Sequence, residues 1–367
     1  MNKSVIIASI AVAAVAIIFL LLPTTPVPLP SPEQVNSTGI EVVASNLEVP
    51  WAMDFADDGR IFFTERVGRV RVIDDGKLID EPVFVKEVAR VGEAGMLGLA
   101  LDPDFGKNEQ IYVYYTYDDS GRLWNRVSKL VKSEIDDYRE EVLVDNIPGG
   151  GIHDGGRIKF GPDGKLYITT GDAAVPDLAQ DKNSLAGKIL RINTDGSIPD
   201  DNPFPNSPVY SYGHKNPQGL AWHPVTRELY ETEHGPTGND EINIIKPGGN
   251  YGWPLEQCSA SEFEEYIDAV VCYQVSVAPS GTTFYSSDRL PYANDLFFGT
   301  LRGVHVEHII FESGNVKKLE NFLEGFGRIR DVVEGPDGYL YVATSNRDGR
   351  GLPASDDDKI LKLTKPR

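Results

Sequence analysis

The sequence predicts an all-β fold, namely a six-bladed β-propeller with four-stranded antiparallel blades. Three observations support this prediction. One strand-and-turn phrase recurs six times, the spacing of its copies matches one propeller blade, and helical periodicity is scarce after about residue 40. A β-sandwich whose turns resemble one another by chance is the alternative.

The clearest copies of the phrase each place an Asp-Gly turn before a strand of β-branched and aromatic residues, the local pattern of a hairpin. They are "FADDGRIFFTER" from Phe55, "FGPDGKLYITTGD" from Phe160 and "EGPDGYLYVATSN" from Glu334. Looser copies begin at Leu99, Leu220 and Ser280, so successive copies start 44 to 61 residues apart. A blade needs about 40–50 residues plus loops, and six copies therefore predict six blades. "DDDKILKLT", residues 356–364, is expected to supply a strand that helps close the ring.

The N-terminal segment is predicted to lie outside the propeller, which we assign to residues 39–367. Residues 5–22 carry no charge over 18 residues, close to the roughly 20 that a spanning helix needs. Residues 1–22 therefore predict a membrane anchor, with a cleaved signal peptide as the alternative. Residues 23–38 begin with "PTTPVPLPSP" and predict a stiff Pro-rich linker. Both alternatives place the propeller outside the cytoplasm, either anchored at the outer face of the cell membrane or secreted.

Charge and cysteine content narrow the function classes. The chain of 367 residues has 35 basic and 55 acidic side chains, a formal net charge of −20. Such a surface repels nucleic acid and anionic lipid, so we expect no nucleic-acid partner, and membrane contact only through the N-terminal segment. The two cysteines, Cys258 and Cys272, lie 14 residues apart, and outside the cytoplasm we expect a disulfide between them. Two free buried thiols are the alternative.

Three loops are chemically unlike the rest of the chain. They read "GGGIHDGGRIKF" (residues 149–160), "SYGHKNPQGLAWHP" (211–224) and "ETEHGPTGNDEINIIKPGGNYGWP" (231–254). With the chain from "NLEVPWAMDF" at Asn46 to the C-terminus, they resemble the soluble pyrroloquinoline quinone (PQQ)-dependent aldose sugar dehydrogenases of the glucose/sorbosone dehydrogenase family, which are six-bladed propellers. The resemblance implies oxidation of aldose sugars at the anomeric carbon to lactones. The electrons would pass to an external acceptor that the sequence does not identify.

The resemblance assigns the catalytic pair to His153 and Asp172. His153 would take the proton of the anomeric hydroxyl while a hydride passes to the quinone, and imidazole suits this step because its ordinary pKa, about 6.5, lies near neutral pH. Asp172, 19 residues further on, would orient the ring and stabilise the imidazolium. The glycines around His153 are expected to keep side chains away from the sugar and the cofactor.

The resemblance also implies PQQ, a flat ortho-quinone with three carboxylates. A protein that holds it must supply cations for the carboxylates and an electrophile at the reactive carbonyl. Arg328 and Arg330 alternate in a strand-like "RIR" stretch, and Lys215 and Arg302 come from two other blades. Gathered by the ring, these four cations would form an anion pocket in an acidic protein. Taken singly, each would be an ordinary surface charge.

Calcium is the implied electrophile, held by the backbone carbonyls of Gly235 and Pro236 in "EHGP". Oxygen ligands suit calcium, and no thiolate chemistry accompanies them. Asn216 and Gln218 in "KNPQG" match cofactor contacts, because amides both donate and accept hydrogen bonds. Glu93 in "GEAGM" is the expected sugar contact.

Two other functions remain open from the sequence. A calcium-dependent lactonase or related hydrolase on the same ring would need carboxylates at the channel mouth and no four-cation pocket. A non-catalytic extracellular propeller would use its blades only as a binding scaffold.

Overall fold

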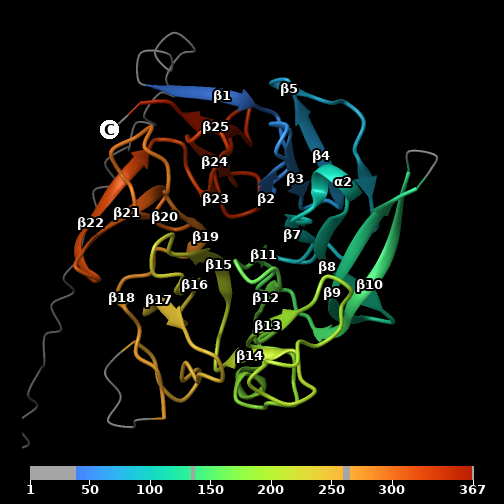
Figure 1. The fold of residues 1–367 in the computed structure, drawn as a ribbon, viewed down its shortest axis with the longest axis vertical. Coiled ribbons are helices and arrows are strands. Elements are labelled where there is room, and N and C mark those ends of the chain that lie inside the picture. The colour runs from blue at the N-terminus through green and yellow to red at the C-terminus, as the bar shows by residue number, and fades with distance from the viewer. Residues whose placement is uncertain (1–38, 134–136, 259–264, 366–367) are drawn as a thin grey trace, which may run out of the picture.

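The computed structural model describes residues 39–133, 137–258 and 265–365. These residues form six antiparallel sheets around a central axis, with very little helix (Figure 1). The predicted six-bladed propeller is confirmed. The predicted anchor and linker, residues 1–22 and 23–38, lie outside the described residues. Within the described ranges no helix is both long and apolar enough to cross a membrane.

In each blade the first strand is innermost and contacts the first strand or strands of neighbouring blades (Figure 1). Blade 1 has β2 (Pro50–Phe55), β3 (Ile61–Glu65), β4 (Arg69–Asp74), β5 (Lys77–Leu78) and β6 (Phe84–Val85). Blade 2 has β7 (Met96–Leu101), β8 (Ile111–Asp119), β9 (Arg122–Lys132) and β10 (Tyr138–Pro148). Blade 3 has β11 (Ile158–Phe160), β12 (Leu166–Thr170), β13 (Lys188–Ile192) and β14 (Val209–Tyr212).

The other three blades follow the same order. Blade 4 has β15 (Pro217–Trp222), β16 (Leu229–Glu233), β17 (Asp240–Ile245) and β18 (Val271–Tyr273). Blade 5 has β19 (Pro279–Phe284), β20 (Leu296–Thr300), β21 (His305–Glu312) and β22 (Asn315–Glu324). Blade 6 has β23 (Ile329–Glu334), β24 (Leu340–Thr344), β25 (Ile360–Leu363) and β1 (Ile40–Ala44). The short helical segments are α2 (Phe105–Asn108) and η1 (Pro176–Ala179).

Both ends of the described chain close the ring. The expected closing strand is confirmed as β25, which pairs with β24 on one side and with β1 on the other. Ile40 lies opposite Leu363 in this last pair. The N-terminal strand thus completes a blade begun by the C-terminal part of the chain. In blade 1 the outer position is shared by two short strands, since β5 and β6 both pair with β4.

The six repeat phrases mark the six blades. Each one begins on an innermost strand, from Phe55 on β2 to Glu334 on β23. Second strands such as β3 and β12 are buried at every position, because each sheet is covered on both faces by its neighbours. Strands in that situation become apolar on both sides and lose the usual inward–outward alternation.

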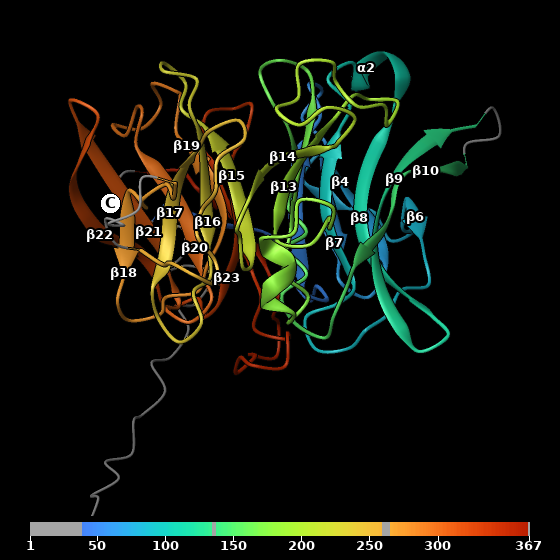
Figure 2. The same ribbon diagram turned by 90° about the horizontal axis from the view of Figure 1, so that it is seen from below.

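Antiparallel pairing brings the predicted site residues to one end of the ring. At this end, which we call the pocket end, the first strand of each blade begins and the second strand ends. Loops before first strands carry His153 and Arg328, and loops after second strands carry Asp172, Gly235 and Arg302. In the edge-on view, loops project from both ends of the strands (Figure 2).

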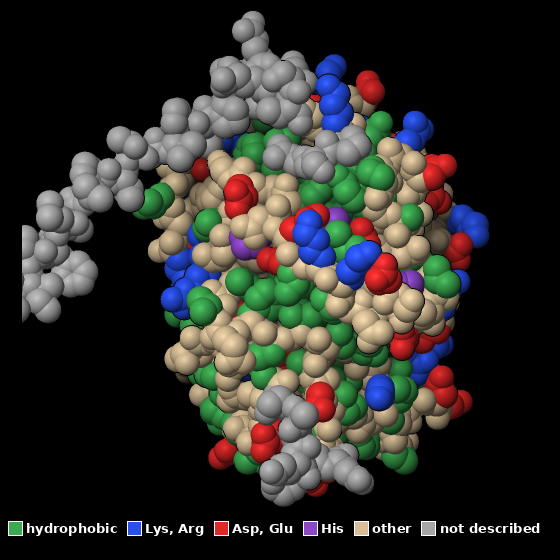
Figure 3. Space-filling model, turned by 90° about the vertical axis from the view of Figure 1, so that its left-hand side faces the viewer, with side chains coloured by type: hydrophobic (Ala, Val, Ile, Leu, Met, Phe, Trp, Pro, Cys, Tyr) green, Lys and Arg blue, Asp and Glu red, His purple; other side chains and the backbone are tan. Residues whose placement is uncertain are grey.

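Charges of both signs are interspersed on the side of the molecule formed by the blades on the left of Figure 1 (Figure 3). On β22, Lys317 pairs with Glu312 at 2.6 Å, and Lys318 pairs with Glu320. Exposed pairs of this kind contribute about 0–1 kcal/mol each. The excess of acidic groups is therefore not gathered into one patch on this side.

Cys258 and Cys272 form the expected disulfide. It ties β18 to the segment beside β17, where the Cys258 N–H donates to Glu241. Replacing both cysteines by serine is predicted to lower the free energy of unfolding by about 3 kcal/mol. The disulfide restricts the unfolded chain, and without it the unfolded state regains the conformational entropy that closing a loop of this length removes. Denaturant unfolding of the variant and of the oxidised wild type checks the difference. Equal midpoints would contradict a stabilising role.

Candidate active site

A pocket of about 270 Å³ opens at the pocket end. Its lining includes residues from the loops of five different blades, and among them are seven that the sequence singled out: Glu93, His153, Lys215, Gly235, Pro236, Arg302 and Arg328. Two larger hollows, of about 640 and 560 Å³, contain none of the predicted site residues. The convergence of chemically matched side chains, and not the size of the hollow, identifies the candidate site.

His153 and Asp172 form a hydrogen-bonded pair. The Nδ1 of His153 lies 2.8 Å from Oδ1 of Asp172, and the Asp172 side chain is 1% exposed. The indole N–H of Trp253 donates to the other carboxylate oxygen at 2.8 Å, and the N–H of Ala174 donates to Oδ1 at 2.8 Å. Both carboxylate oxygens of Asp172 act as acceptors, so Asp172 accepts the hydrogen bond from Nδ1 and leaves Nε2 of His153 facing away from it.

The glycines around His153 serve the packing of the main chain. A Cβ on Gly171 would lie 1.8 Å from the carbonyl oxygen of His153, and a Cβ on Gly155 would lie 2.7 Å from the N of Gly171. His153 itself has a φ of 60°, so the loop turns through the left-handed region. We expected the glycines to clear space for sugar and cofactor. At Gly155 and Gly171 the missing Cβ has a further consequence, because it lets two neighbouring loops touch, and this contact brings His153 beside Asp172.

Glu93 reaches the same pocket from blade 2. One of its carboxylate oxygens accepts the His153 N–H at 3.1 Å, and the other accepts Arg350 at 2.6 Å. Burial opposes ionisation of Glu93, but the charges of His234 and Arg350 outweigh it and lower the pKa. Glu93 is therefore a carboxylate at neutral pH, and it lines the pocket.

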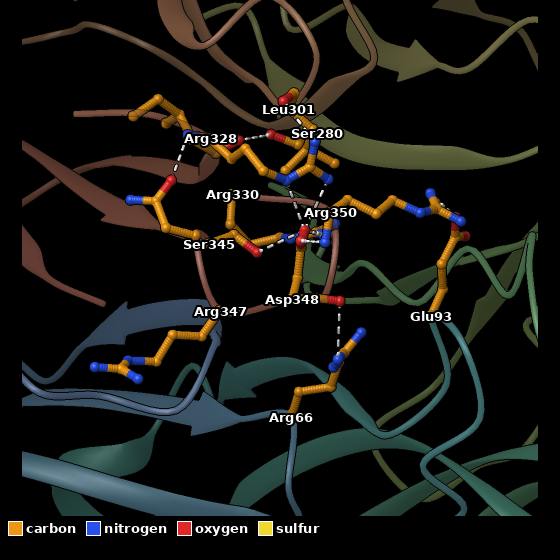
Figure 4. Close-up of polar contacts among 12 residues, drawn as sticks. Arg66, Glu93, Ser280, Leu301, Arg328, Arg330, Ser345, Arg347, Asp348 and Arg350 are labelled. Carbon is orange, nitrogen blue, oxygen red and sulfur yellow. Dashed lines mark hydrogen bonds and ion pairs between the residues drawn. The ribbon is translucent and has the colours of Figure 1, made fainter. Parts of the chain in front are cut away.

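The carboxylate of Asp348 contacts both Arg328 and Arg330 (Figure 4). Arg328 donates through Nε and Nη2 to Oδ2 of Asp348, at 2.8 and 2.7 Å, and through Nη1 to the carbonyl of Leu301. Arg330 is buried and donates to Gln218 at 2.7 Å. Burial lowers the pKa of Arg330 to about 10, so it remains a cation. Its Nε has no hydrogen-bond partner among the described residues.

The second loop places Lys215 and Asn216 against the first. Nζ of Lys215 lies 3.0 Å from Nε2 of His153, and Oδ1 of Asn216 accepts the Gly155 N–H at 3.1 Å. Nδ2 of Asn216 lies 3.2 Å from the ring of His234. Arg302 is exposed at the pocket mouth. Three of the four predicted cations thus line one pocket, and the buried Arg330 contacts the same carboxylate, that of Asp348, as Arg328.

The loop with the predicted calcium ligands is fixed by Asp240. Its Oδ1 accepts the Gly235 N–H at 2.8 Å, and its Oδ2 accepts three donors from residues 276–278. Among the described residues no group donates a hydrogen bond to the carbonyl of Gly235 or Pro236. Two unpaired oxygen donors beside an anion pocket fit a hard cation. Asp240, whose oxygens are both engaged, supports the loop.

A buried cluster of His214, Glu231 and Glu233 supports Lys215 from behind. Their ligand atoms lie within 4.8 Å of one another, and the Lys215 N–H donates to Glu233 at 3.1 Å. Burial lowers the pKa of His214 to about 3 and raises that of Glu233 to about 8. The imidazole is therefore neutral at pH 7.

Four contributors to the site were not predicted: Arg66, Trp253, Asp348 and Arg350. Arg66 donates to the main chain of Asp348 at 3.3 Å and to Gly92 at 2.8 Å (Figure 4). The repeat offered a signal for Arg66, since it ends the blade 1 phrase at the position of Gly171 in the blade 3 phrase. Asp348 and Arg350 lie in a glycine-containing loop just after the sixth phrase.

The sequence model of the glucose/sorbosone dehydrogenase family matches residues 47–354. The chain belongs to this family. Aldose sugar dehydrogenase YliI of Escherichia coli is 36% identical over 352 residues, covering 89% of this chain and 94% of that protein. Quinoprotein glucose dehydrogenase B of Acinetobacter calcoaceticus is 35% identical, over 58% of this chain and 52% of its own length. The structure of PQQ-bound aldose sugar dehydrogenase from Streptomyces coelicolor is 35% identical and has a TM-score of 0.79, covering 88% of this chain and 97% of that one.

These similarities confirm the family that the motifs predicted. A sugar dehydrogenase of the glucose/sorbosone dehydrogenase family is thereby established as the general class of this chain. The non-catalytic propeller and the lactonase lose their support, because neither accounts for a match that runs through 89% of the chain to an aldose sugar dehydrogenase.

Proposed function

We propose that this chain oxidises aldose sugars at the anomeric carbon to lactones, using PQQ and calcium. The observation that carries the proposal is the meeting, in one pocket, of an Asp-bound imidazole with cations from three blades. An anion pocket in a chain of net charge −20 has to be assembled by the fold. The similarity to quinoprotein glucose dehydrogenase B and to the PQQ-bound structure of an aldose sugar dehydrogenase adds support.

The residues present fit the chemistry of PQQ. Arg302, Arg328 and Lys215 line the pocket, and the buried Arg330, whose Nε has no hydrogen-bond partner among the described residues, contacts Asp348 together with Arg328. Arginine binds carboxylates through two parallel hydrogen bonds. Asn216 and Gln218 hold the loops of this pocket in place, through Gly155 and Arg330. Bound there, PQQ would supply a two-electron acceptor for a hydride, and calcium a Lewis acid at its carbonyl.

The carbonyls of Gly235 and Pro236 would hold calcium. They are oxygen ligands of the type that calcium prefers, and they stand free of hydrogen bonds from the described residues. Two protein ligands are too few for a calcium ion, which takes six to eight oxygens. Calcium binding in this pocket is therefore expected to depend on the cofactor.

The protein's own part in the reaction is proton transfer and positioning. Nε2 of His153 accepts the proton of the anomeric hydroxyl as C1 loses its hydride, so that the sugar gives up one hydride and one proton (two electrons and two protons in all) and becomes the lactone. Asp172 stabilises the imidazolium that forms. Glu93 accepts a hydrogen bond from a sugar hydroxyl and orients the ring.

The disulfide and the apolar N-terminal segment support a location outside the cytoplasm. A disulfide persists in an oxidising compartment, so we propose an extracytoplasmic enzyme. Residues 1–22 would anchor it at the outer face of the cell membrane, or it would be secreted after their cleavage. The catalytic domain would span residues 39–367. Its partners would be an aldose and an electron acceptor outside the cell.

Reconstitution tests the proposal. The purified chain, given PQQ and calcium, is expected to reduce an artificial electron acceptor when an aldose is added, and to form the lactone. Omitting PQQ, or removing calcium with a chelator, should abolish the reaction. Activity that ignores both additions, or hydrolysis of a lactone with calcium alone, would contradict it.

A further inference from the structure

Lys215 contacts the reactive nitrogen of the proposed base. Its Nζ lies 3.0 Å from Nε2 of His153, on the side of the ring opposite Asp172. The two residues lie on different loops, before β11 and before β15. The Asp172 N–H donates to the Lys215 carbonyl at 2.8 Å, so the two residues on either side of the His153 ring are also joined through the main chain.

Donor and acceptor roles in this contact are fixed by chemistry. An ammonium group only donates, so Nε2 of His153 must be unprotonated and must accept. The proton then sits on Nδ1 and is donated to Asp172. The result is a chain of hydrogen bonds that runs from Lys215 through His153 to Asp172. An unprotonated Nε2 has one lone pair, and while Lys215 occupies it a sugar hydroxyl has nowhere to deliver its proton.

The ammonium is held only loosely at this position. Lys215 is buried, which lowers its pKa, although the charge of Asp172 partly offsets this. Nζ has one hydrogen-bond partner among the described residues, and it also lies 5.7 Å from the centre of the Trp253 ring. Two of its three N–H groups are therefore free. An anionic oxygen in the pocket is a better acceptor than a neutral imidazole, because charge-assisted hydrogen bonds are roughly twice as strong.

We propose that Lys215 masks His153 in the cofactor-free protein, and that an anionic ligand in the pocket draws the ammonium away and frees the base. This inference rests on the proposed role of His153. It makes Lys215 a positioning residue that sets the tautomer of the base and couples its availability to the bound cofactor. The sugar then becomes a productive ligand only after the cofactor has entered.

Chemical modification of the cofactor-free chain tests the masking. Diethyl pyrocarbonate acylates unprotonated imidazole nitrogens, and mass spectrometry gives the rate at each histidine. Lys215→Met is expected to speed acylation of His153 by about tenfold, the factor for one lost hydrogen bond to a charged group. Lys215→Arg keeps a cationic donor and should stay slow. Lys182→Met, at an exposed lysine, is the matched control and should change nothing.

Two internal standards keep the test decisive. His223, in the turn between β15 and β16 at the other end of the ring, should react equally fast in all variants, and the fully buried His214 should stay unreactive. An unchanged His153 rate in Lys215→Met would overturn the proposal. If His214 becomes reactive in Lys215→Met, the variant has lost its fold, and nitrogen NMR of the wild type then tests the masking. A proton on Nδ1 of His153 supports masking, and a proton on Nε2 refutes it. Neither readout uses cofactor or sugar, so failure here is distinguishable from failure of the dehydrogenase function.

Discussion

Replacing His153 by alanine is expected to lower turnover of the PQQ-loaded enzyme by about 10²–10⁴-fold, the range found for general bases. The reason is that Nε2 of His153 is the nitrogen proposed to take the hydroxyl proton, and Asp172, 2.8 Å from Nδ1, orients the imidazole ring for that step. PQQ affinity should change little, because the cations that hold its carboxylates remain. Steady-state kinetics with an artificial acceptor, together with a PQQ titration, separates turnover from binding.

His223→Ala is the matched control for this prediction. His223 also lies in a loop, at the opposite end of the ring, and within the part of the chain that the structure describes its ring accepts hydrogen bonds only from its own turn. Its replacement should leave turnover unchanged. A His153→Ala enzyme that loses PQQ affinity as strongly as turnover would indicate that His153 is a structural residue.

Arg328→Gln is expected to weaken PQQ binding by about 10- to 100-fold. A hydrogen bond to a charged group contributes about 1.5–3 kcal/mol, and 1.4 kcal/mol corresponds to a factor of ten. Arg328 lines the pocket and is held in position by Asp348, so its guanidinium is already oriented before a ligand arrives. Equilibrium titration of the variant with PQQ, at fixed calcium, measures the loss.

Arg289→Gln provides the comparison for Arg328. Arg289 is an exposed arginine beside the turn after β19, on the opposite end of the ring. It removes the same charge from the same protein, so any general effect of net charge appears in both variants. Equal affinity of the Arg328 and Arg289 variants for PQQ would show that the pocket cations do not bind the cofactor.

Much of the fold could be predicted because a propeller repeats. The Asp-Gly turns after Phe55, Phe160 and Glu334 are local signals, and each fixes the junction between the first and second strands of its blade. β1 was not predicted, because its partner β25 lies more than 300 residues away. No short pattern in residues 40–44 states that pairing. The two short outer strands of blade 1 were missed for a similar reason, since each is only two residues long.

The candidate site could likewise be predicted only where its residues lie in a local sequence motif. His153 and Asp172 could be predicted because each lies in a long motif, and the structure places them 2.8 Å apart. Asp348 and Arg350 could not, since their relevance comes from side-chain contacts, with Arg328 in the same blade and with Glu93 in blade 2. The contact of Lys215 with His153 could not be predicted from the sequence either. Such pairings depend on side-chain directions that only the closed ring determines.

The central claim is that one end of the ring forms a pocket for a planar trianion beside an imidazole. Titration of the purified chain with PQQ, with and without calcium, tests it most directly. The account predicts saturable binding of one PQQ per chain, which strengthens with calcium and weakens about 10- to 100-fold in Arg328→Gln. Absence of binding in the presence of calcium, or binding that is unaltered in Arg328→Gln, would contradict it.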